Sequence, residues 1–555
     1  MPRAPELLPR DVLRRYAPHG GTLWGLLTSR AAIQADRAFL IYEGQEVSWR
    51  EFQEKVERTV QLLRSYGVSP GDRVAVMAEN SADYVAIVFA TMAAGAIFVP
   101  INPDLKPAEA EYIVEHAEPA VVFASDAAAG TLQRISATFA KGIKTLALAA
   151  GLDQLGQAHT SAANTGASAR RQDGPGKESA TEERSTAGTA HGKPDSTGLI
   201  LYTSGTTGFP KGVMHSQQNM VVAGEYCVER LHLQPEDRML CILPFFHINA
   251  LIYSLMGAAV AGASLVIAPR FSASGFWKLA ADTGATQVNI IAAVGRILMR
   301  RPRSEFIPGH KLRKLYGAPI TPDIYRAFQN EFGIPTLIEG YGLTETPCVC
   351  SNPYSGPQRV GSIGIPTPHP VSSQPSARMR IADASGRDVA QGTVGELMVQ
   401  SPIAMQGYYR DPQATAAVLK DGWFRTGDLV KQESDGYYTF VARQKDIIRR
   451  RGENISGAEL DEIVSRHPDI QAAAAIPVES ELGEDEILIA AVKRPQALLT
   501  EPALRKWCEE QLSKAKLPRF IVFVDELPYT PSHRVAKFQL RNDASLKQRA
   551  IEFTE

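Results

Sequence analysis

The sequence contains one stretch that is dense in hydrogen-bond donors, Thr203-Ser204-Gly205-Thr206-Thr207-Gly208-Phe209-Pro210-Lys211-Gly212. Glycine lets backbone N–H groups approach a ligand closely, and hydroxyl side chains add further donors. The lysine adds a compact positive charge that suits phosphate. The stretch therefore predicts a loop that wraps a polyphosphate. A plain surface turn is the alternative, although a turn does not require this density of donors beside a lysine.

The spacing in this loop differs from that of a Walker A loop, which requires Gly, four residues and then Gly-Lys-Ser/Thr. Here two residues separate Gly205 from Gly208, and two more separate Gly208 from Lys211. The apolar run 199–202 before the loop predicts a strand, and a helical pattern begins after residues 216–219.

Length and composition limit the classes of protein. A chain of 555 residues is too long for one hydrophobic core, so two or more domains are expected. The net charge of -1 gives no reason to expect nucleic acid as a partner. The 5 cysteines are sparse and odd in number, which favours a reducing, cytoplasmic location over a disulfide framework. Residues 1–6 have no apolar core, so no secretory signal is predicted.

The uncharged run 250–269 is long enough to span a bilayer. It is rich in Ala, Gly and Ser, and Gly257 and Gly262 divide it into a helix-like part and a strand-like part with Val and Ile. We therefore predict a buried helix followed by a core strand, and no membrane span.

Strand and helix signals alternate through most of the chain, which favours an α/β fold with mainly parallel sheets. Ser81 is the expected N-cap of a helix over 81–94. Strands are predicted at 72–77, 96–100, 120–123, 145–148, 239–244, 264–267 and 287–291.

The domain organisation follows from changes in composition. Residues 156–196 contain almost no large apolar side chains, so they cannot offset the entropy lost on ordering, and we predict a flexible surface insertion. Short β segments dominate from 375 to 442, and a compact α+β pattern follows from 446, with helices at 456–466 and 501–513 and a strand at 487–492. We expect a large N-terminal α/β domain with a β-rich subdomain, 1–442, a boundary at 443–446, and a small α+β domain, 447–555.

Three further stretches carry chemistry. Residues 341–346, Tyr-Gly-Leu-Thr-Glu-Thr, offer an aromatic face that can stack on a base and a carboxylate that can hold Mg²⁺. Residues 422–429 are expected to place Asp428 in a tight turn, where it can accept hydrogen bonds from ribose hydroxyls. Residues 442–455 form a basic stretch that we expect to be a loop. Each stretch alone is also compatible with a turn, a solvated charged face or a linker.

In this order and spacing, the stretches resemble those of the adenylate-forming superfamily, which includes acyl-CoA synthetases, peptide-synthetase adenylation domains and luciferases. The resemblance spans about residues 20–540. The segment 407–412 and the carboxyl-terminal sequence are most similar to bacterial acyl-CoA ligases of the carnitine/crotonobetaine or medium-chain kind. The resemblance implies that a carboxylate attacks the α-phosphate of ATP, and that a thiol, usually coenzyme A, then displaces AMP from the acyl-adenylate.

The resemblance also implies roles for individual residues. The β,γ-phosphates of ATP would be held by Thr203, Ser204, Gly205, Thr206, Thr207, Gly208 and Lys211. The adenine pocket would be lined by Gly317, Ala318, Pro319, Glu339, Gly340 and Tyr341. Thr344 would contact the α-phosphate and Glu345 would bind Mg²⁺. Asp428 and Arg443 would bind the ribose.

Further implied roles concern the acyl group and the change between half-reactions. His247 matches the aromatic or histidine gate near the acyl pocket, with a packed core histidine as the alternative. The small C-terminal domain would rotate about a hinge at 443–446 with Lys445 at the pivot. The loop 449–452, which ends at Gly452, would then approach the thiol.

The sequence departs from the family pattern at Arg534, at His533, which falls on the family's glycine, and at Tyr316, where relatives often have Gly. Relatives supply a lysine to adenylation within a Pro-x-Thr-x-Gly-Lys-like segment, and aligning Thr530-Pro531-Ser532 with it places Arg534 on that lysine. Arginine is longer and planar, so it cannot place a point charge in the same way. Lys537, three residues later, is a possible substitute.

Four readings therefore remain open. The first is an acid–CoA ligase that uses ATP/AMP, Mg²⁺ and coenzyme A. The second is an enzyme that forms only the thioester, from an acyl-adenylate made by a separate adenylating enzyme. The third is an adenylation enzyme that loads a carrier protein, and the fourth is a catalytically reduced nucleotide-binding protein.

Overall fold

The computed structural model describes residues 6–135, 144–148, 151–152, 154–155, 192–203, 210–371, 377–450, 453–479, 485–512, 516–529 and 535–553. The chain folds into two compact units. The first unit contains the chain up to Thr203, Pro210–Ala377 and Ser401–Leu419, and the second contains Arg378–Gln400 and Lys420–Glu555.

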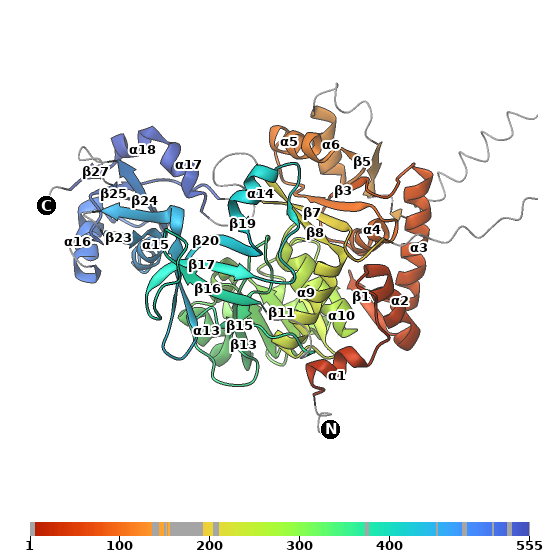
Figure 1. The fold of residues 1–555 in the computed structure, drawn as a ribbon. Coiled ribbons are helices and arrows are strands. Elements are labelled where there is room, and N and C mark those ends of the chain that lie inside the picture. The colour runs from red at the N-terminus through yellow and green to blue at the C-terminus, as the bar shows by residue number, and fades with distance from the viewer. Residues whose placement is uncertain are drawn as a thin grey trace, which may run out of the picture. The chain divides into compact units, whose positions relative to one another are not determined.

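A seven-stranded sheet of the first unit has the order β18-β8-β7-β4-β3-β5-β6. Figure 1 shows β7 and β8 of this sheet side by side. The five strands from β7 to β6 run parallel, whereas β8 and β18 add antiparallel at one side. The bounds are β3 Arg73–Met77, β4 Ile97–Ile101, β5 Pro119–Ala124, β6 Lys144–Ala147, β7 Thr197–Thr203, β8 Lys211–Ser216 and β18 Gly407–Tyr408.

A nine-stranded sheet of the same unit has the order β15-β14-β13-β12-β11-β9-β10-β1-β2. Its six central strands, β13 to β1, are parallel, and antiparallel strands close both sides. The bounds are β1 Ala38–Tyr42, β2 Gln45–Ser48, β9 Arg238–Cys241, β10 Ser264–Ile267, β11 Gln287–Ile290, β12 Lys314–Gly317, β13 Thr336–Tyr341, β14 Cys350–Ser351 and β15 Ile365–Pro366. The predicted α/β fold with mainly parallel sheets is confirmed.

Several helices of the first unit begin at a side-chain cap. Ser81 accepts a hydrogen bond from the Tyr84 N–H, as predicted, and Ser216 caps α9 by accepting from the Asn219 N–H. The α-helices are α1 Pro9–Arg14, α2 Leu23–Gln34, α3 Trp49–Ser65, α4 Ala82–Ala93, α5 Pro107–Ala117, α6 Asp126–Arg134, α9 Gln217–Leu231, α10 Gly257–Ala261, α11 Phe276–Asp282, α12 Ala292–Met299, α13 Pro322–Arg326 and α14 Pro412–Val418. Shorter turns are 3₁₀ η3 Arg303–Glu305 and π-helix η4 Ala327–Glu331.

The uncharged run 250–269 lies inside this unit. A π-helix, η2 Asn249–Met256, continues into α10, and β10 follows. Helix α10 packs beside α9 (Figure 1). Every residue of α10 and β10 is buried, so the predicted buried helix and core strand are confirmed. In the described part of the chain, no helix has both the length and the apolar composition needed to cross a membrane.

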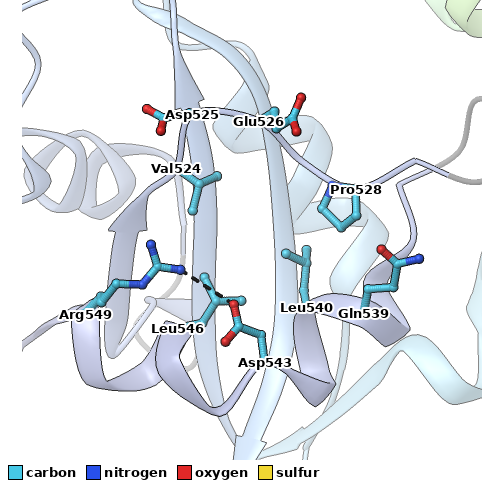
Figure 2. Close-up of a pocket in the computed structure, with 9 residues that line it drawn as sticks. All are labelled: Val524, Asp525, Glu526, Pro528, Gln539, Leu540, Asp543, Leu546 and Arg549. Atoms are coloured by element: carbon cyan, nitrogen blue, oxygen red, sulfur yellow. Dashed lines mark ion pairs between the residues drawn. The ribbon is translucent and has the colours of Figure 1, made fainter.

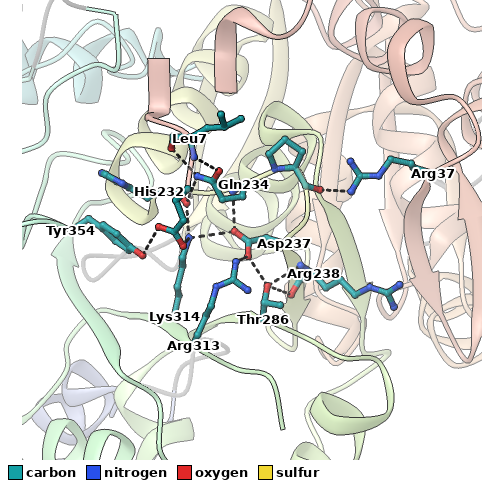
Figure 3. A network of polar contacts seen from close by, with 12 residues as sticks. Leu7, Arg37, His232, Gln234, Asp237, Arg238, Thr286, Arg313, Lys314 and Tyr354 are labelled. Atoms are coloured by element: carbon teal, nitrogen blue, oxygen red, sulfur yellow. Dashed lines mark hydrogen bonds and ion pairs between the residues drawn. The ribbon is translucent and has the colours of Figure 1, made fainter. Parts of the chain in front are cut away.

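The N-terminal segment is attached to the first unit by polar contacts (Figure 3). The Leu7 N–H donates to Gln234 Oε1 at 2.9 Å, and Gln234 Nε2 donates back to the Leu7 carbonyl at 3.1 Å. Asp237, which is buried, accepts from Thr286 Oγ1 at 2.8 Å and lies 3.4 Å from Lys314 Nζ. Arg313 also contacts the Asp237 carboxylate. The network holds the segment around Leu7 near the beginnings of strands β9 and β12.

The second unit is rich in β structure. One sheet has the order β16-β17-β20-β19 with β21 beside β20, and another has the order β24-β25-β26-β27. The bounds are β16 Arg378–Ala382, β17 Val394–Gln400, β19 Leu419–Lys420, β20 Trp423–Gln432, β21 Tyr438–Arg443, β24 Ile470–Glu479, β25 Asp485–Lys493, β26 Phe520–Phe523 and β27 Ile551–Glu552. Its helices are η5 Gln444–Asp446, α15 Gly457–Ser465, α16 Glu501–Gln511, α17 Lys537–Asn542 and α18 Ala544–Arg549.

The prediction of a loop over 442–455 is wrong. Half of this stretch lies in an antiparallel pair, β22 Ile447–Arg450 with β23 Glu453–Ser456. Ile448 and Ile455 are buried partners in this pair. These two isoleucines lie opposite each other and both point to the buried face of the pair. Their burial favours strands even though most of the neighbouring residues are charged.

Two predictions on domains, the insertion and the boundary, remain predictions. Residues 156–191 of the predicted insertion lie outside the described residues, and 192–196 lead directly into β7. The predicted boundary at 443–446 falls within the second unit, because that unit also includes the β-rich segments before it. The hinge concerns motion and stays a prediction.

Candidate active site

The donor-rich loop is held at both ends by a β-hairpin. Thr203 ends β7 and Lys211 begins β8, and the two residues are paired across the strands. Thr203 Oγ1 donates to the Lys211 carbonyl at 3.4 Å. The predicted phosphate residues Ser204, Gly205, Thr206, Thr207 and Gly208 lie outside the described residues. The described geometry therefore fixes where the loop leaves and rejoins the sheet.

Tyr408 contacts both Lys211, at the end of the donor-rich loop, and Glu345. Its hydroxyl donates to Glu345 Oε1 at 2.9 Å, and Lys211 Nζ lies 5.0 Å from the centroid of its ring. Burial raises the pKa of Tyr408, and the neighbouring Glu345 carboxylate raises it further, so the hydroxyl keeps its proton. Sequence reasoning missed Tyr408, because its role depends on the pairing of β18 with β8.

A buried histidine fixes the backbone beside Glu345. His215 Nε2 donates to the Thr344 carbonyl at 2.7 Å, and Asn219 Nδ2 lies 3.4 Å from His215 Nδ1. Burial lowers the pKa of His215 to about 4, so the ring is neutral at pH 7. A second hydrogen bond holds this backbone: the Met405 N–H donates to the Glu345 carbonyl at 2.7 Å. Thr344 and Glu345 thus lie beside the hairpin that holds Lys211.

The predicted adenine-pocket residues come from two adjacent strands. Gly317 on β12 pairs with Glu339 on β13, and Ala318 and Pro319 follow β12 directly. Gly340 allows a close approach, because a Cβ there would lie 2.9 Å from the Cys350 carbonyl oxygen. Tyr341 is buried, with 8% of the residue exposed.

Glu339 has an unusual environment. It is 7% exposed, and burial raises the pKa of its carboxyl to about 8 even though the Ile320 and Gly361 N–H groups oppose this shift. The Gly361 N–H lies 3.3 Å from Glu339 Oε2. At pH 7 the side chain therefore carries a proton that can be donated.

His247 lies at the start of the π-helix η2. Its ring is 4.7 Å from the ring of Phe246, and its carbonyl accepts from the Leu251 N–H at 3.2 Å. The side chain is partly exposed, unlike that of a fully packed core residue. The acyl-gate role stays a prediction.

The predicted ribose residues lie together in the second unit. Asp428 on β20 pairs with Arg443 on β21, and Arg443 Nε lies 3.5 Å from Asp428 Oδ1. The prediction that Asp428 lies in a tight turn is wrong. The turn lies at Asp421 and Gly422, and Gly427 instead marks a point beside an irregularity in strand register. Glycine is favoured in some bulges as well as in tight turns, which explains the error.

A buried carboxylate supports the strand before Asp428. Glu396 is 6% exposed, and Arg425 Nε donates to its Oε2 at 3.1 Å. The Gly427 N–H donates to Oε1 at 3.2 Å. Glu396 therefore holds the backbone next to Asp428.

The region of the predicted hinge begins with the 3₁₀ turn η5. Arg541 Nη2 donates to Asp446 Oδ1 at 2.7 Å. Lys537, the possible substitute for a catalytic lysine, is 9% exposed and lies 2.6 Å from Asp461 Oδ2, so it is already paired. Arg534, Gly452 and the side chain of Lys445 lie outside the described residues.

A groove in the second unit is lined by a different set of residues (Figure 2). None of the residues predicted for catalysis or nucleotide binding lines it. The lining residues are Val524, Asp525, Glu526, Pro528, Gln539, Leu540, Asp543, Leu546 and Arg549.

Two family models match the chain. A model described as AMP-binding enzyme matches residues 27–409, which is more than half of the chain, and one described as AMP-binding enzyme C-terminal domain matches 459–534. The chain belongs to the AMP-binding enzyme family, and it is an enzyme of the AMP-forming acid–thiol ligase class.

Particular relatives place the chain among CoA ligases. It is 33% identical over 531 residues to the sulfoacetate–CoA ligase of Cupriavidus necator, covering 94% of this chain and 98% of that protein. It is 29% identical to the crotonobetaine/carnitine–CoA ligase of Salmonella paratyphi C, covering 92% and 97%. The structure of ATP-bound MatB from Rhodopseudomonas palustris matches with a TM-score of 0.78 at 27% identity, covering 94% and 98%. The predicted resemblance is confirmed.

Proposed function

We propose that the protein joins a small carboxylic acid to coenzyme A through an acyl-adenylate, using ATP. The observation that carries this proposal is the contact of Tyr408 with both Glu345 and Lys211, beside Thr344 held by His215. This cluster combines a cation for phosphate, a carboxylate for a metal ion and a hydroxyl, at the point where the donor-rich loop rejoins the sheet. These are the groups that phosphoryl chemistry requires.

Mg²⁺ fits the donor set. Glu345 supplies carboxylate oxygens, the ligand type that Mg²⁺ prefers. In the described part of the chain, no three His, Cys, Asp or Glu side chains gather to form a metal site. This composition suits an ion held by one carboxylate together with the ATP phosphates. The bound ion would neutralise phosphate charge.

The remaining roles belong to both units. In the first unit, the Gly317–Pro319 and Glu339–Tyr341 strand ends would receive the adenine, and His247 would border the acyl group. In the second, the paired Asp428 and Arg443 would bind the ribose hydroxyls. A cytoplasmic location agrees with 5 cysteines that are all free.

The names of the relatives suggest the first acids to test. Sulfoacetate and the crotonobetaine/carnitine pair are small acids, each with a second charged group. The decisive assay measures ATP/pyrophosphate exchange for each acid, then thioester formation after coenzyme A is added. Exchange and thioester with at least one acid would support the proposal. Exchange that never proceeds to a CoA thioester would favour loading of a carrier protein.

Arg534 motivates a second candidate, an enzyme that only converts a supplied acyl-adenylate into the thioester. A synthetic acyl-adenylate offered with coenzyme A separates the two half-reactions. Turnover from the adenylate but not from the free acid would favour the second candidate.

The matched variant is Arg534→Lys, which restores the point charge of the family pattern. If arginine weakens adenylation, this variant should release pyrophosphate about tenfold faster or more, with unchanged turnover of the synthetic adenylate. Equal pyrophosphate release by both proteins would show that arginine serves as well as lysine. Lys537→Ala tests the alternative cation, which the Asp461 pair argues against.

A further inference from the structure

Tyr408 makes two different contacts with the groups placed around the phosphates. Its hydroxyl donates to Glu345 Oε1 at 2.9 Å, and the face of its ring lies under Lys211 Nζ at 5.0 Å. The residue is 7% exposed. A buried tyrosine hydroxyl requires a partner, and a carboxylate gives a charge-assisted hydrogen bond.

The position of Tyr408 is fixed by its backbone. It pairs with Val213 on β8, two residues after Lys211, and its N–H donates to Thr415 Oγ1 at 2.8 Å. Gly407 has a φ of 144°, which favours glycine, and a Cβ there would lie 3.0 Å from Thr415 Cγ2. The ring is therefore attached to the same strand that carries the lysine.

A lysine and a glutamate near each other would ordinarily form an ion pair. Within the described residues, no carboxylate lies within salt-bridge distance of Lys211, and its ammonium instead rests on the Tyr408 ring. A cation–π contact in a partly exposed site is weak, so a phosphate can displace it easily. A direct pair with Glu345 would have to be broken before either group could meet the nucleotide.

We propose that Tyr408 is a positioning residue that holds Lys211 and Glu345 in separate, ready orientations. Its hydroxyl aims the Glu345 carboxylate for the metal ion, and its ring supports the Lys211 ammonium for the phosphates. This inference rests on the proposed function, because it needs a nucleotide and a divalent cation at these groups.

The two contacts are separable by substitution. Tyr408→Phe keeps the ring and removes the hydroxyl, so it should weaken only the metal-dependent part of nucleotide binding. Tyr408→Leu removes both contacts, so it should also weaken binding without metal. A role in packing alone would not divide in this way.

Titration calorimetry with a non-hydrolysable ATP analogue, in Mg²⁺ and in EDTA, measures both parts. For Tyr408→Phe, affinity in EDTA should stay within about twofold of wild type, whereas the gain in affinity on adding Mg²⁺ should fall about tenfold, as expected for a lost hydrogen bond to a charged group. Tyr408→Leu should lose several-fold in EDTA as well. Mn²⁺ binding to the analogue complex, followed by electron paramagnetic resonance, should weaken in both variants.

Tyr409→Phe is the matched control, because Tyr409 lies in the same segment but its ring contacts His116 and Arg410. It should bind like wild type in both conditions. Tyr408→Phe should add no further loss of Mg²⁺ dependence in a Glu345→Gln background. Melting temperatures within a few degrees of wild type would show that the variants are folded.

The outcomes separate the two proposals. Wild-type Mg²⁺ enhancement in Tyr408→Phe, with normal analogue binding, would overturn this inference alone. The same loss in EDTA for the Phe and Leu variants would also overturn it. Failure of the wild-type protein to bind the analogue would overturn the proposed function and this inference with it.

Discussion

Glu339 shows how burial alone can change the chemistry of one residue. Its carboxyl has a pKa of about 8, far above the value of 4.5 expected in the unfolded chain, because it is shielded from water. Only backbone N–H groups oppose the shift. A protonated acid beside the expected adenine pocket can donate a hydrogen bond where a carboxylate could only accept one.

This shift predicts a pH-dependent stability. Between about pH 4.5 and 8 the folded protein holds a proton that the unfolded chain has lost, so the free energy of unfolding should fall as pH rises through this window. One group contributes at most about 1.4 kcal/mol per pH unit. Denaturant titrations of wild type and Glu339→Gln at several pH values test this, and the variant should lack that component. Parallel profiles for the two proteins would contradict the assignment.

Tyr408 and His215 illustrate the limit of sequence reasoning at this scale. The donor-rich loop and the 341–346 stretch carry their chemistry in adjacent residues, so their residue types could be read directly. Tyr408 matters only because β18 pairs with β8, and His215 only because β8 passes Thr344. A histidine in the strand that follows the donor-rich loop was the signal available in the sequence.

At the scale of elements, local signals succeeded where they were strong. The cap at Ser81 and the apolar runs of the parallel strands placed these elements within one to three residues. The loop prediction for 442–455 failed, because the many charged residues there drew attention away from Ile448 and Ile455, which pair in two strands. The turn assigned to Asp428 failed because glycine serves a bulge as well as a turn.

The polar network around Asp237 predicts that the substitution of this one carboxylate lowers the free energy of unfolding strongly. Asp237→Asn removes the negative charge that faces Lys314, which is buried, and Arg313, which is half-buried (Figure 3). Removing one partner of a buried pair typically costs about 3–5 kcal/mol. Glu6, whose carboxylate lies 3.7 Å from Lys314 Nζ, would be the carboxylate left beside the lysine. Urea denaturation of the variant should show this loss.

Glu236→Gln is the matched control for this substitution. Its carboxylate is exposed and lies 4.0 Å from Arg37, so its removal should change stability by no more than about 1 kcal/mol. Equal losses for the two variants would mean that burial of Asp237 is not the cause.

At the scale of the whole molecule, family membership rests on order rather than on any single motif. The fold class, the parallel sheets and the acid–thiol ligase class were all predictable, because several stretches occur in a specific sequence along 555 residues. The acid was not predictable, since the residues near it come from separated strands and helices. Whether the protein catalyses adenylation with Arg534 in place of lysine is decided by the pyrophosphate-release assay.

The burial of all five cysteines has a practical consequence for measuring motion. Thiol-reactive dyes should leave the native protein almost unlabelled, so they would report only on cysteines introduced at exposed positions. Ile33 in the first unit and Leu498 in the second are exposed by 49% and 92%. Fluorescence energy transfer between dyes at Ile33→Cys and Leu498→Cys should change when an acyl-adenylate analogue is followed by coenzyme A. Unchanged transfer would argue against rotation about 443–446.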